Sequence, residues 1–184
     1  MITTEDNFKK ALNFVLLEEG VRGNSTGYVN NPSDRGGETN YGITHLSYDA
    51  YRRFKKLPIQ SVKLMSRDEV TEIYRVNYWL SGGCNLLPSK LGLIHFDWCV
   101  NHGTGGAIKT LQKVVGVADD GIIGGVTKQA IIRAIVNQSE TALCNTYLVH
   151  RENYYRIIAN NNLSQKVFLQ GWLNRLAALK KEIA

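Results

Sequence analysis

The sequence predicts one mostly α-helical domain of two lobes, with seven or eight helices and a small irregular or β lobe at about residues 20–44. Apolar residues recur every three or four positions over most of the 184 residues, a pattern typical of helices packed on a common core. The stretch 18–44 breaks this pattern, because it is polar and rich in glycine and other turn formers. No repeat, low-complexity tract or linker divides the chain. A long loop of distinct composition inside a compact domain is more often functional than accidental, so we expect the chemistry there.

The first predicted helix covers residues 5–19. Thr3 or Thr4 can cap its start, and Gly20 can end it. Its apolar face carries Phe8, Leu12, Val15 and Leu16. The same spacing places Glu19 on this face, at the carboxyl end of the helix. Since the helix dipole disfavours an acid at that end, the position of Glu19 calls for a reason.

The segment that follows, residues 20–44, is expected to be a loop region with a small hairpin around Tyr28–Val29 and Tyr41–Ile43. Helical spacing resumes over residues 46–54. Pro58 breaks it, because proline cannot continue a helix.

The second half is predicted to be helical. Ser66 and Glu69 have the spacing of a capping box, which opens a helix that ends at Ser81-Gly82-Gly83. The remaining predicted helices cover residues 88–101, 107–115, 127–136, 139–160 and 164–183. The apolar face of the last one is expected to hold Val167, Phe168, Leu169, Trp172, Leu173, Leu176 and Leu179.

Composition and charge exclude several classes of protein. The formal charge of +6 favours an anionic partner, but the 22 basic residues are spread out, so no nucleic-acid partner is expected. Three cysteines at irregular spacing make no disulfide framework and suggest synthesis in a reducing compartment. The N-terminal residues make a poor signal peptide and too short an apolar run to span a bilayer, so no membrane insertion is expected.

Glycoside hydrolysis is the first chemistry that the residues suggest. It needs a carboxylic acid that can donate a proton to the leaving oxygen, and apolar surroundings favour the protonated form. Glu19 fits this demand, since it lies on an apolar face next to a glycine-rich loop. Asp34 could balance charge or position water, and the Thr39 hydroxyl could hold a water. The plainer interpretation is that Glu19 is a solvated helix end and that Asp34 and Thr39 satisfy local turns.

Four other chemistries compete with this one. A metal site could use His95, Cys99 and His102, whose spacings of four and three share a helix face, although no known zinc motif is present. A cysteine peptidase could use the same cysteine with a neighbouring histidine and Asn101. Gly103-Thr104-Gly105-Gly106 before a helix could hold a phosphate. A noncatalytic wall-binding module could use Trp79, Trp98, Trp172 and the nine tyrosines to stack on sugars. For most of these residues, packing in the core is the simpler explanation.

The stretch around Glu19 resembles glycoside hydrolase family 108, the N-acetylmuramidases common among phage endolysins. The matching residues are Glu19-Gly20, Tyr28, Asn30-Asn31-Pro32, Asp34, Gly36-Gly37, Thr39 and Tyr41-Gly42-Ile43-Thr44. The second half resembles the peptidoglycan-binding region usual in that family. The matching residues are Tyr78-Trp79, Leu87-Pro88, the stretches 96–103 and 107–112, Asp120-Gly121-Ile122-Ile123-Gly124, Thr127 and Gly171-Trp172-Leu173-Asn174-Arg175. The chain departs from the family at Val21, where a second glycine is usual, and by an insertion before Tyr28, which leaves Glu18 as an alternative register for the acid.

The resemblance implies a lysozyme-like fold that hydrolyses the β-1,4 bond between N-acetylmuramic acid and N-acetylglucosamine. It carries the role of general acid to Glu19. We further expect Asp34 and Thr39 in supporting catalytic roles and Tyr28, Tyr41 and Gly42 in substrate binding. Residues 1–85 would be the catalytic part of the single domain 1–184, and residues 86–184 the part that resembles a peptidoglycan-binding region.

The resemblance also fixes the expected partners. We expect bacterial peptidoglycan as substrate, no cofactor or metal for the reaction, and a monomer. A phage endolysin would be made in the host cytoplasm and released to the cell wall through a holin. A lytic transglycosylase, or a noncatalytic cell-wall-binding or virion protein, remains the alternative.

Overall fold

The computed structural model describes residues 3–23, 25–30 and 37–184. In this part of the chain it holds eight α-helices and one two-stranded sheet, which confirms the predicted, mostly helical fold with a small β lobe. The helices are α1 (Thr4–Glu18), α2 (His45–Phe54), α3 (Arg67–Tyr74), α4 (Ser89–His102), α5 (Thr104–Val114), α6 (Gly125–Gln138), α7 (Glu140–Asn161) and α8 (Leu169–Glu182). The strands β1 (Thr39–Asn40) and β2 (Ile43–Thr44) are antiparallel, with Thr39 opposite Thr44.

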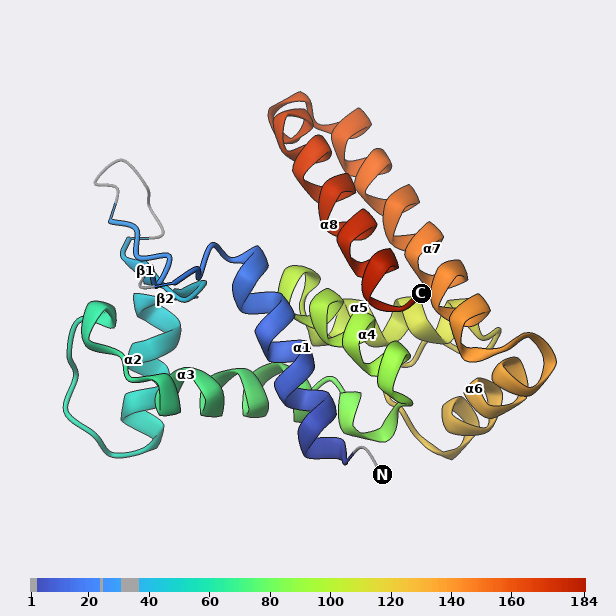
Figure 1. Ribbon diagram of the computed structural model, residues 1–184, viewed down its shortest axis with the longest axis horizontal. Coiled ribbons are helices and arrows are strands. Elements are labelled where there is room, and N and C mark those ends of the chain that lie inside the picture. The colour runs from blue at the N-terminus through green and yellow to red at the C-terminus, as the bar shows by residue number, and fades with distance from the viewer. Residues whose placement is uncertain (1–2, 24, 31–36) are drawn as a thin grey trace.

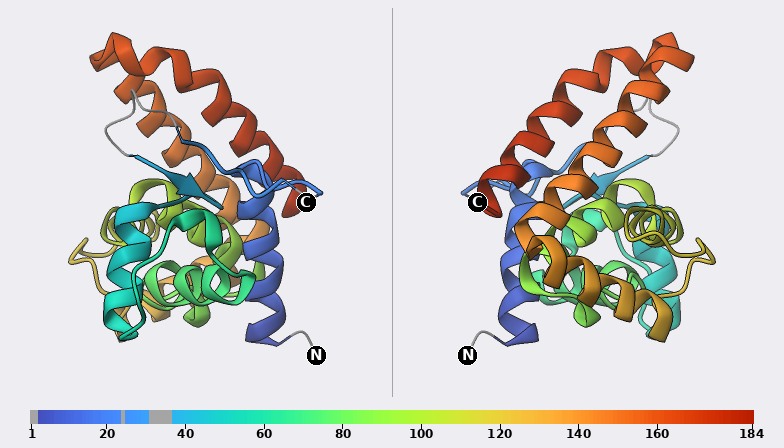
Figure 2. Two further views of the ribbon diagram at one scale, coloured as in Figure 1. Left: turned by 90° about the vertical axis from the view of Figure 1, so that its left-hand side faces the viewer. Right: turned by 90° about the vertical axis from the view of Figure 1, so that its right-hand side faces the viewer.

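The elements form two lobes that α1 separates (Figure 1). The sheet, α2 and α3 lie on one side of α1, and α4, α5 and α6 lie on the other. The two C-terminal helices, α7 and α8, form an antiparallel hairpin that projects from the second lobe, as both end views also show (Figure 2). None of the helices in the described residues is long and apolar enough to cross a membrane.

Helix α4 is the centre of the core. Its nine consecutive residues Leu91–Cys99 are all buried, because α1, α5 and α7 pack around it. A helix that is apolar on every face is typical of a protein interior. The two polar residues inside this run, His95 and Asp97, therefore need hydrogen-bond partners within the protein.

Helix α1 carries the first candidate residue to the junction of the two lobes. Thr3 and Asp6 form a capping box at its start, so Thr3 is the N-cap of the two residues, Thr3 and Thr4, that the sequence offered. The helix ends at Glu18, and Glu19 is its C-cap residue. Gly20 follows with a φ of +83°, a left-handed conformation that suits glycine and turns the chain out of the helix.

The small lobe contains the predicted hairpin in a shifted position. Tyr41 and Gly42 form its turn, with φ angles of +53° and +73°, instead of lying in a strand. Val29 pairs with Thr39 through one isolated bridge, so the Tyr28–Val29 arm adds no strand of its own. The turn points Gly42 toward the end of α1, which is where the candidate acid lies.

Two helices differ from their predicted form. The helix that begins at Arg67 continues beyond α3 as a π-helical stretch, Arg75–Leu80, a form that often occurs near functional sites. The last predicted helix begins as a 3-10 helix, Leu163–Phe168, and α8 starts only at Leu169. The prediction that Val167 and Phe168 belong to its buried face is wrong, because they are 73% and 51% exposed.

Candidate functional site

Glu19 sits where α1 ends, and its carboxylate is held by a residue from the far end of the chain. Arg175 of α8 donates a hydrogen bond from Nη1 to Glu19 Oε1 at 3.0 Å. The Glu19 side chain is 27% exposed and that of Arg175 is 10% exposed. This contact supplies the reason for an acid at the unfavourable end of a helix dipole, since a cation now faces it.

Arg175 belongs to a buried chain of charges. Its Nε donates to Asp97 Oδ1 at 2.8 Å, and Nη2 of Arg151 donates to Asp97 Oδ2 at 2.6 Å. The side chains of Asp97 and Arg151 are both fully buried. The guanidinium of Arg151 also lies over the Trp98 ring, 4.5 Å from its centroid. The network Glu19–Arg175–Asp97–Arg151 therefore joins the candidate acid to the centre of the core.

The charges in this network reinforce one another. Burial alone would lower the pKa of Arg175, but the carboxylates of Asp97 and Glu19 raise it above its ordinary value. Arg175 is therefore a fixed cation that holds Glu19 Oε1 in one position. The other carboxylate oxygen, Oε2, faces the turn of the small lobe.

Gly42 packs directly against the carboxylate of Glu19. A Cβ atom on Gly42 would lie 3.1 Å from Glu19 Oε2 and 2.9 Å from the hydroxyl of Tyr74. That hydroxyl donates to the Tyr41 carbonyl oxygen at 2.8 Å, which holds the turn in place. A second glycine, Gly27, approaches the main chain of Glu19, since its Cβ would lie 2.7 Å from the carbonyl oxygen. The glycines of the 20–44 segment thus allow two close approaches to Glu19.

Replacing Gly42 with alanine should displace the Glu19 carboxylate and reduce activity about 10–100-fold, the scale of a small misplacement of a reacting group. Gly23→Ala is the matched control, because Gly23 also has a positive φ but nothing lies within 4 Å of its Cβ position. Both variants carry a similar backbone strain, and only the first touches the site. Initial rates on purified sacculi would separate them. Equal rates in the two variants would show that the Gly42 contact does not position Glu19.

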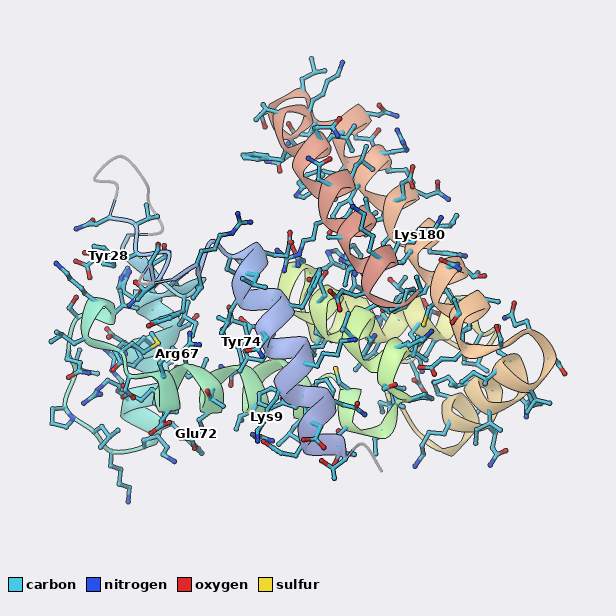
Figure 3. All side chains as sticks on the ribbon, in the orientation of Figure 1. Lys9, Tyr28, Arg67, Glu72, Tyr74 and Lys180 are labelled. Atoms are coloured by element: carbon cyan, nitrogen blue, oxygen red, sulfur yellow. The ribbon has the colours of Figure 1, made fainter. Side chains whose placement is uncertain are left out.

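The other predicted site residues that the structure describes, Tyr41, Tyr28 and Thr39, lie in the small lobe. Tyr41 is 7% exposed, and the guanidinium of Arg67 lies over its ring, so its carbonyl rather than its ring faces the site. Tyr28 is half-buried in the small lobe, with Lys63 over its ring, and Figure 3 shows it away from Tyr74, which lies beside α1. Thr39 is half-buried and pairs through its main chain with Val29. Within the described residues, neither Tyr28 nor Thr39 hydrogen-bonds to Glu19. Asp34 lies outside the described residues.

The residues of the competing chemistries are mostly buried. Cys99 is fully buried, so it cannot reach a peptide substrate as a peptidase nucleophile would have to. Trp79 and Trp98 are also buried, which leaves Trp172 as the half-buried tryptophan that could meet a sugar. His102 stacks on the Trp98 ring and meets the Tyr154 ring edge-on, and it does not join Cys99 in a metal-ligating group. Arg175 bonds to Glu19 and not to Glu18, which favours Glu19 over Glu18 as the candidate acid.

Three residues of the site were not identified from the sequence: Arg175, Asp97 and Tyr74. The sequence held a signal for Arg175 and Asp97. Each is a lone charge inside an apolar helical stretch, and a charge that is buried there needs a partner of opposite charge. For Tyr74 no signal separated it from the other core aromatics.

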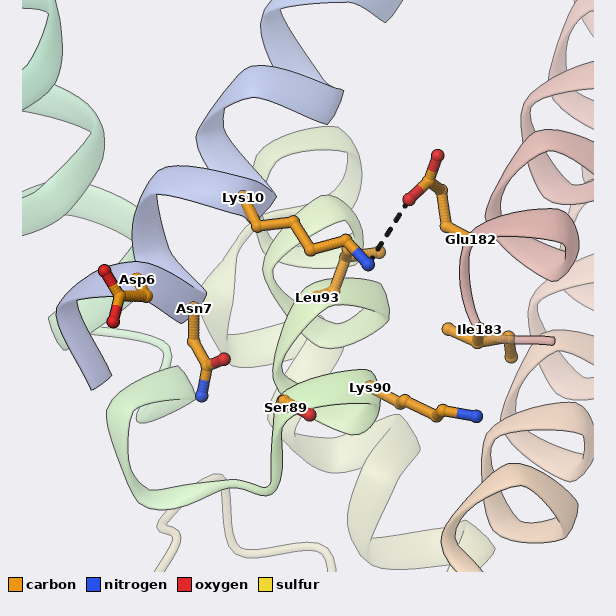
Figure 4. Close-up of a pocket in the computed structure, with 8 residues that line it drawn as sticks. All are labelled: Asp6, Asn7, Lys10, Ser89, Lys90, Leu93, Glu182 and Ile183. Carbon is orange, nitrogen blue, oxygen red and sulfur yellow. Dashed lines mark ion pairs between the residues drawn. The ribbon is translucent and has the colours of Figure 1, made fainter. Parts of the chain in front are cut away.

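A pocket elsewhere on the surface does not contain this site. It measures about 490 Å³ and lies at the start of α1, beside the ends of α4 and α8 (Figure 4). Lys10 and Glu182 form an ion pair of 3.4 Å at its edge. None of the predicted catalytic or substrate-binding residues lines it. Since α1 rises about 1.5 Å per residue, this pocket is roughly 14–20 Å from Glu19 along the helix.

The tyrosines beside Glu19 predict a loss of stability in alkali. Burial, followed by the charge of Glu19, raises the pKa of Tyr74 and of Tyr78 above the ordinary tyrosine value. The folded protein thus keeps neutral phenols at a pH where the unfolded chain ionises them. This stabilisation is fully present below about pH 10 and is lost as the pH rises through the folded-state pKa values.

Thermal unfolding followed by circular dichroism between about pH 8 and 11.5 should show a midpoint that falls above about pH 10. Tyr74→Phe cannot ionise, so its midpoint should fall less steeply than that of the wild type. Parallel slopes for the two proteins would contradict the assignment.

Comparison with known families and structures gives three findings. Residues 12–103, half of the chain, match the family described as Glycosyl hydrolase 108. Residues 106–177 match the family described as Predicted Peptidoglycan domain. Among solved structures, the chain is similar to SagA of Brucella abortus, with 29% sequence identity and a TM-score of 0.76, over 97% of this chain and 94% of that one. A comparison with curated proteins finds no significant match.

Proposed function

Because the chain belongs to the Glycosyl hydrolase 108 family, we propose that it is an N-acetylmuramidase with Glu19 as its general acid. The two family matches together support a glycoside hydrolase that acts on peptidoglycan. The bond that it cleaves is the β-1,4 bond between N-acetylmuramic acid and N-acetylglucosamine. The glycan crosses the end of α1, between the 20–44 segment and α8.

The observation that carries this proposal is the setting of the Glu19 carboxylate. Arg175 holds Oε1, and Gly42, which has no side chain, lies against Oε2. A general acid must reach the glycosidic oxygen from a fixed position, and a carboxyl group held by one of its oxygens meets this need. In its protonated form, Glu19 gives the Oε2 proton to the leaving oxygen as the bond to the anomeric carbon breaks, and the carboxylate that results faces the Arg175 cation.

The second half of the reaction needs a water or a second carboxylate. Asp97 cannot serve, because it is fully buried and bound by two arginines. Asp34 and Thr39 remain the residues proposed to stabilise the developing positive charge or to hold the attacking water. Tyr28, Tyr41 and Gly42 are the residues proposed to border the glycan.

Mass spectrometry of the fragments released from purified sacculi tests the proposal. A muramidase releases hydrated muropeptides with reducing N-acetylmuramic acid, because water adds to the cleaved bond. A lytic transglycosylase would release anhydro products lighter by one water, and a glucosaminidase would leave reducing N-acetylglucosamine. Either product would overturn the muramidase assignment. Binding without any release would support a wall-binding or virion protein instead.

The charge of the chain predicts that binding to the wall depends on salt. With a formal charge of +6, the protein is attracted to the anionic polymers that accompany peptidoglycan. Raising NaCl from about 0.05 M to 0.5 M shortens the screening length from roughly 14 Å to 4 Å, so sedimentation with sacculi should fall several-fold. Unchanged sedimentation over this range would rule out steering by charge.

The biological setting is that of a phage endolysin. The enzyme is made in the host cytoplasm and reaches the wall when a holin opens the inner membrane. Expression in a bacterial host tests this: lysis should follow co-expression with a holin and should not follow expression of the enzyme alone. Lysis without a holin would show that the protein leaves the cytoplasm by another route.

A further inference from the structure

A second cluster of reactive side chains lies in the core, outside the Glu19 site. Cys84, His95 and Cys99 each offer one metal-ligating atom, and these atoms all lie within 4.8 Å of one another. All three residues are fully buried. His95 and Cys99 are four residues apart on one face of α4, and Cys84 comes from the short 3-10 helix Cys84–Leu86. The sequence alone pointed to His102 as the third member, and the structure replaces it with Cys84.

Gly82 closes one side of this cluster with its main chain. A Cβ atom on Gly82 would lie 2.5 Å from Cys99 Sγ and 3.3 Å from Cys84 Sγ, so only glycine leaves the space between the sulfurs and the chain. The carbonyl oxygen of Gly82 lies 2.9 Å from His95 Nε2. Any side chain at position 82 would therefore fill the space beside the two sulfurs.

The imidazole of His95 is oriented from outside the cluster. Its Nδ1 lies 2.8 Å from the hydroxyl of Tyr147, and that hydroxyl also reaches the carbonyl oxygen of Ala107 at 3.0 Å. A ligating histidine usually binds the metal through one nitrogen while the other keeps a hydrogen bond to a carbonyl or a polar side chain. Here both nitrogens have partners in the protein, so metal binding requires one of them to leave Gly82 or Tyr147 while the other keeps its contact and holds the ring in place.

We propose that Cys84, His95 and Cys99 bind one thiophilic d¹⁰ cation, Zn²⁺ or Cu⁺. Two sulfurs and one imidazole nitrogen are soft donors, which select these ions over Mg²⁺ or Ca²⁺. On binding, the two thiols lose their protons to solvent and two metal–sulfur bonds form, with no change of oxidation state. The cation ties the 3-10 helix after the π-helical stretch to the central helix α4, and its role is structural, since Cys84 and Cys99 do not reach the surface.

Metal analysis of protein purified under reducing conditions tests this proposal, and titration of the metal-free protein with Zn²⁺, Cu⁺ and Co²⁺ distinguishes the ions. We expect close to one equivalent of bound metal and a sulfur-to-cobalt charge-transfer band in the near ultraviolet. Cys84→Ser and Cys99→Ser should each lose at least tenfold in affinity, the scale of losing a thiolate ligand. Cys144→Ser is the matched control, because Cys144 is a free, buried cysteine outside the cluster.

Several outcomes would overturn the proposal. Wild-type protein that takes up less than about a tenth of an equivalent of every ion is one of them. A Cys144→Ser variant that loses metal as the other two do is another. An intact mass lower by two hydrogens, with Cys84 joined to Cys99, would show a disulfide in place of the metal site. If the serine variants do not fold, the thermal midpoint of the metal-free wild type decides, because it must rise with Zn²⁺ or Cu⁺ and not with Mg²⁺. None of these readouts depends on hydrolytic activity, so the test stands apart from the muramidase assignment.

Discussion

Replacing Glu19 with glutamine is expected to reduce muropeptide release by about 10²–10⁴-fold, the usual contribution of a general acid. Glutamine has nearly the same shape and can still accept the hydrogen bond of Arg175 through its amide oxygen, so the fold should be retained. It has no acidic proton to donate to the leaving oxygen. The measurement is the initial rate of fragment release from sacculi, with circular dichroism to verify the fold.

Glu18→Gln is the control for this experiment. Glu18 is the last residue of α1, half-buried, and no hydrogen bond or ion pair joins its carboxylate to another described residue. Its replacement should leave the rate close to that of the wild type. If only Glu18→Gln lost activity, the acid would be one residue earlier and the arginine contact would have another purpose. If a folded Glu19→Gln remained active, Glu19 would not be the acid at all.

Removing the carboxylate of Asp97 is expected to have the largest effect on stability. Asp97→Ala leaves two buried arginines, Arg151 and Arg175, without their shared anion. Breaking a buried ion pair by removing one partner costs about 3–5 kcal/mol, because the remaining charge cannot be solvated. Typical domains are stable by only about 5–15 kcal/mol, so much of the protein should be unfolded at moderate urea concentrations.

Urea unfolding followed by circular dichroism measures this loss. Asp119→Ala is the matched control, since Asp119 forms an ion pair with Lys113 in which both side chains are largely exposed. Exposed pairs contribute little, so its midpoint should stay close to that of the wild type. An Asp97→Ala variant that unfolds at the same urea concentration as this control would show that the buried arginines find other partners.

Local signals in the sequence predicted much of the fold and pointed to one residue of the candidate site. Helical spacing and capping residues predicted the helices well, because these features depend on neighbours a few positions apart. The change of composition at residues 18–44 pointed to Glu19 and to the hairpin that brings Gly42 beside it. These features all lie within one short stretch of chain, where sequence patterns carry most of their information.

The partners of Glu19 could not be found in the same way. Arg175 is 156 residues away, and no pattern within a helix tells which distant charge a lone arginine will meet. Asp97 posed the same problem, because its burial was evident from the apolar stretch around it but its two partners were not. In the cluster of Cys84, His95 and Cys99, only Cys84 was missed, because it lies in a 3-10 helix that follows a π-helical stretch. The prediction for the segment before α8 was wrong for another reason. This segment is a 3-10 helix, which turns Val167 and Phe168 away from the face that they would occupy in an α-helix.

The distance between Glu19 and Arg175 along the chain also sets an order of events during translation. At about 5–20 residues per second, a ribosome makes Arg175 roughly 8–30 s after Glu19. Until then the Glu19 carboxylate lacks the cation that positions it, and Asp97 lacks one of its two arginines. A nascent chain can therefore form α1 and the small lobe early, while the complete Glu19 site appears only once α8 has been synthesised and has docked.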